Sequence, residues 1–172
     1  ELERSIRDAQ TLVAVEDLYR PYKPKRRTRA MIAKEKGLEP LADLISMQMV
    51  KEPLLQAAAA YISQEKGVET AEDAIQGAKD ILAERISDNA EYRTYIRNAT
   101  MNKGVVQSSA KDEKAQSVYE MYYNYEEPVK KCAGHRILAL NRGENEKILT
   151  VKIAAPEDQI LMYLEKQTIV RD

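Results

Sequence analysis

The stretch Glu16-Asp-Leu-Tyr-Arg-Pro-Tyr-Lys-Pro-Lys-Arg-Arg-Thr-Arg-Ala30 joins two segments with a helical pattern, and the rest of the chain is arranged around it. From Arg20 to Lys36 the cations are Arg20, Lys23, Lys25, Arg26, Arg27, Arg29, Lys34 and Lys36. The one acid in that range is Glu35, although the whole chain has a formal net charge of −1. Such segregation of charge predicts a polyanion or an acidic protein surface as partner.

The composition is that of a soluble globular chain. Its 172 residues are enough to bury a core as one domain, and 32% of them are charged. No apolar run approaches the roughly 20 residues that a membrane span needs. The single cysteine, Cys132, cannot form an internal disulfide, which suits a reducing cytoplasm. Because the chain opens inside an amphipathic pattern, we expect it to be part of a longer protein.

Apolar residues that recur every three or four positions predict a mainly α fold, an irregular domain of about eight helices over residues 1–172. The first helix is expected to run from Leu2 to about Tyr19, before Pro21. Thr28 is the expected N-cap of a short helix that Gly37 ends. The segment Thr70–Asp73 has the pattern of a capping box at the start of a long helix. A further helix is expected over Asp112–Tyr123.

The pattern changes after Pro128. Residues 136–142 and 146–153 are rich in Ile, Leu and Val, and Gly143 and Asn145 lie between them. The sequence therefore predicts one β-hairpin at Arg136–Ile153. Val105–Ala110 is a second segment that can be extended. A lone hairpin is marginal in water, so we expect it to dock on the helices or on another part of the protein.

Residues with catalytic chemistry are scarce. With one His and one Cys, the usual zinc ligands cannot form a cluster, and no glycine-rich phosphate loop occurs. Cys132 and His135 could form a thiol–imidazole pair, but nothing near them in sequence indicates an oxyanion site. The simpler interpretation places Cys132 in the core and lets His135 bond to the backbone. We therefore predict a protein that is not an enzyme and that holds no metal or cofactor.

Tyrosine is the only aromatic residue in the chain, which has ten Tyr and neither Phe nor Trp. The cluster Tyr119, Tyr122, Tyr123 and Tyr125 could offer stacking faces to nucleic-acid bases. Its helical spacing favours core packing instead. Tyr19 and Tyr22 are expected to pin the basic stretch to the core.

The basic stretch allows two interpretations. In the first it is a structural connector, whose cations pair with the acidic helices. In the second it contacts phosphates, with affinity that is independent of sequence and sensitive to salt. The candidate nucleic-acid-binding residues are Lys23, Lys25, Arg26, Arg27, Arg29 and Lys34. We call residues 23–29 the basic arm.

Three segments carry a resemblance to a known family. Glu16–Ala30 followed by Ala33–Ala42 closely resembles the bacterial transcription accessory protein family Tex. Ala71–Ile86 agrees with it, as does Tyr122–Val129 leading into His135–Glu144, so the resemblance extends over nearly the whole chain. Gly134, before the His-Arg pair, is a mild departure.

This resemblance implies several properties. Tex-like proteins are multi-domain and cytoplasmic, with a helical N-terminal region, a RuvC-like domain, helix-hairpin-helix elements and an S1 domain that binds nucleic acid. The chain would be the helical region ahead of the RuvC-like domain, and no catalytic residue carries over to it. The expected partners are nucleic acid, the downstream domains and RNA polymerase. We therefore expect a non-catalytic scaffold whose basic arm is an auxiliary nucleic-acid contact. The alternative is a protein-interaction module that docks the transcription machinery or the downstream domains through the hairpin and exposed tyrosines.

Overall fold

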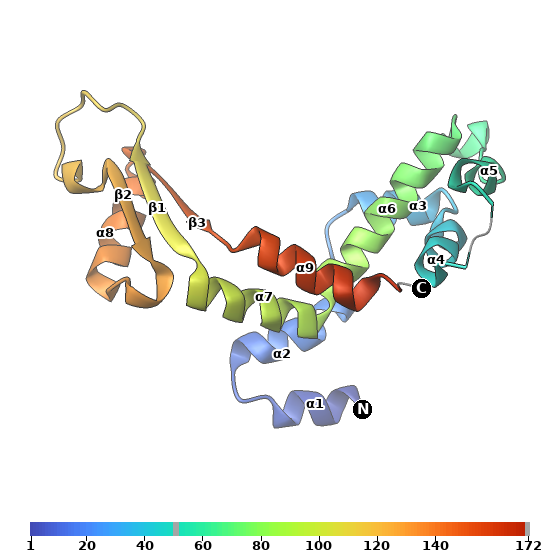
Figure 1. Cartoon of the computed structure of the whole chain (residues 1–172), viewed down its shortest axis with the longest axis horizontal. Coiled ribbons are helices and arrows are strands. Elements are labelled where there is room, and N and C mark those ends of the chain that lie inside the picture. Colours follow the sequence, from blue (N-terminus) through green and yellow to red (C-terminus); the bar gives the residue numbers. More distant parts are fainter. Residues whose placement is uncertain (50–51, 171–172) are drawn as a thin grey trace. The chain divides into compact units, whose positions relative to one another are not determined.

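A computed structural model describes residues 1–49 and 52–170, which divide into two compact units (Figure 1). Unit 1 holds the described residues of Glu1–Arg93 with residues 169–170, and unit 2 is Thr94–Thr168. Helices dominate, and a small antiparallel sheet lies in unit 2. The prediction of a mainly α, multi-helix fold is confirmed. No helix in the described part of the chain has the length and apolar character that crossing a membrane requires.

The described regular structure of unit 1 is helical, apart from an isolated β-bridge between Ser63 and Val68. Its elements are α1 (Leu2–Asp8), α2 (Leu12–Tyr19), α3 (Arg29–Glu35), α4 (Glu39–Met47), α5 (Leu54–Ala59), α6 (Ala71–Asp88), the start of α7 (Ala90–Lys103) and 3₁₀ turns at Arg20–Tyr22 and Gln64–Lys66. The single helix expected from Leu2 to Tyr19 is wrong. The chain is extended at Ala9, and α2 has its own N-cap, because the Thr11 hydroxyl accepts the Ala14 N–H at 3.2 Å.

Helix α6 is the centre of unit 1, and α3, α4 and α5 pack against it (Figure 1). The core is rich in small residues; its buried members are Ala30, Ala33, Leu38, Leu41, Ala42, Ala58, Val68, Ala74, Ala78 and Ile81. Gly77 of α6 lies where the helices meet. A Cβ atom at this position would lie 2.3 Å from Cδ1 of Leu38, the N-cap of α4, so a side chain here would force Leu38 to shift.

The local signals for helix boundaries in unit 1 are confirmed. The Thr70 hydroxyl accepts the Asp73 N–H, and the Asp73 carboxylate accepts the Thr70 N–H, both at 3.1 Å, which is the predicted capping box. Thr28 caps α3 by accepting the Met31 N–H at 3.1 Å. Gly37 follows α3 with a φ of 80°, a left-handed conformation that glycine adopts at little cost.

Unit 2 combines the rest of α7 with a three-stranded sheet. Its other elements are β1 (Val105–Ala110), β2 (Asn124–Pro128), α8 (Gly134–Asn145), β3 (Leu149–Ala154), α9 (Glu157–Thr168) and 3₁₀ turns at Glu120–Tyr122 and Val129–Lys131. The strand order is β2-β1-β3, and both pairings are antiparallel. In the register, Ser108 of the central strand lies between Tyr125 and Val151.

The predicted β-hairpin at Arg136–Ile153 is wrong. Its first half belongs to α8, and its second half is β3, which pairs with β1. The apolar run Ile137–Leu140 fits a strand or a helix, and packing decides for the helix. Leu140 and Gly143, three residues apart, are both buried, and a Cβ at Gly143 would lie 2.6 Å from Leu149 Cδ1. The helix expected over Asp112–Tyr123 is also wrong, because only the turn Glu120–Tyr122 is helical there.

The tyrosine cluster builds the core of unit 2. Tyr119 and Tyr122 are buried with Val106, Leu140 and Leu149, so the core interpretation of these two tyrosines is confirmed. The Tyr119 hydroxyl donates to the Glu146 carboxylate at 2.9 Å. Tyr119 thus keeps its ring in apolar surroundings while its hydroxyl reaches a carboxylate.

Candidate nucleic-acid interface

Two prolines determine how the basic arm leaves α2. The turn Arg20–Tyr22 contains Pro21, and Lys23 then adopts φ −71° and ψ 132°, values close to a polyproline II helix. Pro24 has no N–H and a fixed φ, so the arm does not continue the helix. The arm remains outside regular helix or strand until Thr28 caps α3.

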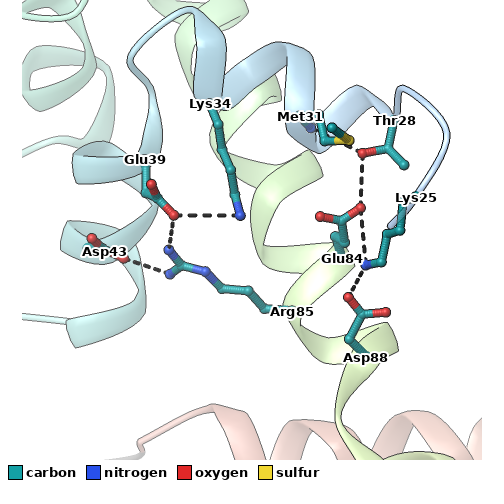
Figure 2. Close-up of polar contacts among 9 residues, drawn as sticks. All are labelled: Lys25, Thr28, Met31, Lys34, Glu39, Asp43, Glu84, Arg85 and Asp88. Carbon is teal, nitrogen blue, oxygen red and sulfur yellow. Dashed lines mark hydrogen bonds and ion pairs between the residues drawn. The ribbon is translucent and has the colours of Figure 1, made fainter. Parts of the chain in front are cut away.

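One side of the arm is attached to the end of α6. Lys25 Nζ lies 3.5 Å from Glu84 Oε1 and also contacts Asp88, and the Thr28 hydroxyl donates to Glu84 at 2.9 Å (Figure 2). Arg20 Nε donates to the same Asp88 carboxylate at 3.1 Å. These two carboxylates lie in the last turns of α6, where the helix dipole disfavours negative charge, so the cations compensate them.

Other cations of the stretch also have protein partners. Arg27 Nη2 lies 2.9 Å from Glu35 in an exposed pair. Lys34 Nζ lies 3.6 Å from Glu39, a carboxylate that Arg85 also contacts at 3.2 Å (Figure 2). The hydrogen bond from Arg85 to Asp43 raises the pKa of the guanidinium further. Of the predicted site residues, Lys25, Arg27 and Lys34 are therefore already engaged.

The remaining predicted site residues form what we call the free row: Lys23, Arg26 and Arg29. All three are exposed, and none makes an ion pair with any described residue. They are spaced by three positions, and in a regular polyproline II segment residues three apart, such as Lys23 and Arg26, would lie on one side roughly 9 Å apart. Arg29 is the first residue of α3. Lys25 and Thr28, also three apart, are the residues that contact α6.

Tyrosines flank the start of the free row. The prediction that Tyr19 and Tyr22 pin the stretch to the core is wrong, since they are 47% and 63% exposed. Tyr22 directly precedes Lys23, so an exposed aromatic ring lies beside the cations. In the sequence, aromatic and basic residues alternate around the prolines, and this alternation is the signal for exposed rings beside the cations. The expectation that both rings lie in the core did not use it.

A pocket of about 440 Å³ lies between α3 and α6, next to the free row. Arg29 and Lys36 line one side, and Asp73 and Asp80 line the other. Lys36 Nζ is occupied by a hydrogen bond of 2.7 Å to the Gly67 carbonyl. With walls of both charges, the pocket does not extend the cationic surface of the free row.

The residues considered for catalysis do not form an activated pair. Cys132 packs against the core of unit 2, and burial and the Glu127 carboxylate raise the pKa of its thiol. A raised pKa keeps the sulfur protonated, whereas a nucleophilic cysteine needs a lowered one. His135 is exposed at the start of α8. Among residues 1–49 and 52–170, no group of three or more His, Cys, Asp and Glu side chains is arranged to hold a metal ion.

A polar cluster around Glu127 joins β2 to α8. The Tyr125 hydroxyl and the Arg136 guanidinium both donate to the Glu127 carboxylate. These bonds lower the pKa of Glu127, while burial and the carboxylate raise the pKa of Tyr125 to about 12. The cluster holds the start of α8 against the sheet, which is a structural task.

The sequence of this chain is similar to a known protein family and to several of its members. Residues 51–170 match the family model described as Tex central region-like. The chain is 53% identical over 171 residues to the uncharacterized protein YdcI of Bacillus subtilis, 40% identical over 160 residues to protein tex of Bordetella pertussis, and 35% identical over 160 residues to the transcriptional accessory protein Tex of Neisseria gonorrhoeae. These alignments cover 98%, 92% and 92% of the chain but only 24%, 20% and 21% of the relatives. The chain therefore spans a quarter or less of each relative.

Proposed function

Because this chain belongs to the Tex family, we propose that it is a non-catalytic helical scaffold segment of a transcription accessory protein, whose basic arm makes auxiliary, sequence-independent contacts with nucleic acid. The observation that supports the contact is the free row: three exposed cations, none of which makes an ion pair with a described residue. The whole protein would supply its other activities through the RuvC-like, helix-hairpin-helix and S1 domains expected downstream. RNA polymerase and a cytoplasmic location belong to the same proposal.

The free row is suited to phosphates because its cations need not leave a carboxylate first. Lys25 and Thr28 attach the arm to α6, so binding has less backbone to order. A lysine and two arginines in a row reach the backbone of a strand but carry no base-reading geometry. Lys25, Arg27 and Lys34 remain predicted site residues of second rank, since each must give up or share a protein partner.

Tyr22 gives the site a preference for single strands. Its ring is 63% exposed and directly precedes the first cation of the free row. Stacking of an unpaired base on an exposed aromatic ring contributes about 1–3 kcal/mol, and duplex bases are not accessible to it. We therefore expect tighter binding to a single strand than to a duplex of the same sequence.

The number of cations sets the salt dependence. Three phosphate contacts give a slope of log K against log salt of about −2.1 for a single strand and about −2.7 for a duplex. Between about 50 and 200 mM salt, binding should weaken by about 20-fold for the single strand and about 40-fold for the duplex. Fluorescence anisotropy with labelled oligonucleotides and the 172-residue chain measures both.

The test compares two triple variants that remove the same charge. Lys23→Ala with Arg26→Ala and Arg29→Ala removes the free row, whereas Lys111→Ala with Lys114→Ala and Lys131→Ala removes three exposed lysines of unit 2. We expect the first variant to lose most of the affinity and of the salt slope, and the second to retain them. Equal losses in both variants would show that net charge, and not the free row, determines binding. Full binding by the first variant would make the arm a structural connector.

A further inference from the structure

The two edges of the sheet in unit 2 differ in how open they are. The Ala110 N–H donates to the Tyr123 carbonyl at 3.0 Å. Because hydrogen-bonded and non-hydrogen-bonded pairs alternate along an antiparallel ladder, the backbone groups of Asn124, Glu126 and Pro128 point away from β1, toward the open edge. Proline has no N–H to offer, and a glutamate beside it discourages another strand. Such residues are a common protection of edge strands. The β2 edge is therefore closed to further pairing.

The β3 edge is less protected, because Lys152 is its one charged residue. The Lys111 N–H donates to the Ile148 carbonyl at 2.9 Å, so Thr150 and Lys152 direct their backbone groups toward β1, and Val151 and Ile153 direct theirs outward. The Val151 N–H meets only the Glu144 carboxylate, at 3.3 Å. Among the described residues of β3 there is no proline. The backbone N–H and C=O groups of Ile153 point away from β1, toward the open edge.

Side chains on the two faces of the β3 edge have opposite character. On the face of α8, Ile153 is 57% exposed. Ile137 is 43% exposed and lies seven residues before Glu144, which puts both on one side of α8. On the other face Lys152 is exposed and makes no ion pair with a described residue. Gln107 lies between Lys152 and Glu126 in the register, and Glu126 accepts a hydrogen bond from Gln107.

We propose that the β3 edge is a docking site for an extended segment of a partner protein in which aliphatic and acidic residues alternate. The added strand would hydrogen-bond to the outward groups of Val151 and Ile153, displacing the Glu144 carboxylate. Its aliphatic side chains would pack on Ile153 and Ile137. Its acidic side chains, on the opposite face because successive residues alternate, would lie beside Lys152. This proposal is independent of the nucleic-acid contact.

A labelled eight-residue peptide of alternating valine and glutamate tests the site with the 172-residue chain in fluorescence anisotropy. Controls are a peptide of the same composition with the valines grouped together and one with lysine in place of glutamate. We expect binding of the alternating Val/Glu peptide alone. Ile153→Pro removes an outward N–H and leaves the β1 ladder intact, so it should weaken binding at least tenfold with an unchanged circular dichroism spectrum. Ile153→Thr keeps the N–H and should weaken binding less.

Reversing the charge at Lys152 should change which peptide binds, and a misfolded variant would not gain binding to a new peptide. Lys152→Glu should bind the Val/Lys peptide and reject the Val/Glu peptide. If Lys152→Glu shows no such switch, or if Ile153→Pro binds as well as the parent chain, the proposal is wrong. If no peptide binds and sedimentation shows a dimer that Ile153→Pro abolishes, the occupant is a second copy of the chain and the proposed partner is also wrong.

Discussion

Replacing Gly77 with alanine tests the packing that positions the basic arm. In an isolated helix the change would stabilise α6 by about 1 kcal/mol, because alanine is the better helix former. In this fold the new Cβ would lie 2.3 Å from Leu38 Cδ1 and 3.3 Å from Ala33 Cβ. Leu38 is 1% exposed, so its side chain must shift against the core or toward the pocket that it lines between α3 and α6. Overpacking of this kind costs about 1–3 kcal/mol, and here we expect the upper end, for a net loss of about 2 kcal/mol.

The same reasoning predicts a change of sign in a second background. Leu38→Ala alone should cost about 2–5 kcal/mol, because it leaves a cavity in the core of unit 1. With that side chain removed, the closest remaining neighbour of the methyl group at position 77 is Ala33 Cβ at 3.3 Å, and Gly77→Ala should stabilise the chain by up to about 1 kcal/mol. The two substitutions are therefore expected to couple by about 3 kcal/mol, within the range seen for residues in contact.

Urea unfolding followed by circular dichroism measures these differences, and amide NMR signals of unit 1 separate its transition from that of unit 2. Gly134→Ala is the matched control, because a Cβ there meets no atom within 4 Å and the change should be neutral or slightly stabilising. If Gly77→Ala stabilises the parent chain, or if its effect is the same with and without Leu38, the steric account of the α3–α6 contact is incorrect.

Three further outcomes follow from the contacts. Thr70→Ala breaks the capping box and should lower the free energy of unfolding by about 1 kcal/mol, whereas Thr70→Ser should not; denaturant titration decides. Glu127 has a lowered pKa through its bonds to Tyr125 and Arg136, so its contribution to stability is complete above the ordinary carboxyl pKa and is lost as the pH falls through the lowered value. Glu127→Gln should therefore destabilise unit 2 at pH 7 and approach the parent chain below about pH 4 in thermal unfolding; a difference that is constant with pH would contradict the linkage. Lys25→Ala should cost about 1 kcal/mol, because Glu84 then keeps only Thr28 and Asp88 only Arg20 as partner, while Arg26→Ala should cost almost nothing. Thermal unfolding of the two variants compares the attached side of the arm with the exposed one.

Local chemistry in the sequence was sufficient to predict much of unit 1. A threonine followed three residues later by an acid fixed the start of α6, and Thr28 and Gly37 bounded α3, because caps involve only neighbouring residues. The sheet could not be predicted in this way. Val105 pairs with Ala154, and the selection of helix for Arg136–Asn145 depends on the contact of Gly143 with Leu149 and on the core beneath α8.

The candidate interface shows the same limit. The density of cations between Lys23 and Lys34 was visible in the sequence. Which of them are engaged was not, because Lys25 finds its partner Asp88 at a separation of 63 residues. The three-residue period of an extended, proline-containing segment is the sequence signal that distinguishes Lys25 and Thr28 from Lys23 and Arg26. The exposure of Tyr22 depends on the turn at Arg20–Tyr22, which the sequence did not reveal.

The most direct test of the account is a two-dimensional amide NMR titration of the chain with a short single-stranded oligonucleotide at low salt. We expect the largest shifts at Tyr22, Lys23 and the residues from Lys25 to Arg29, with reversal as salt is added. Shifts concentrated in unit 2, or no shift at the basic arm while the oligonucleotide binds, would contradict the assignment of the free row as the nucleic-acid contact.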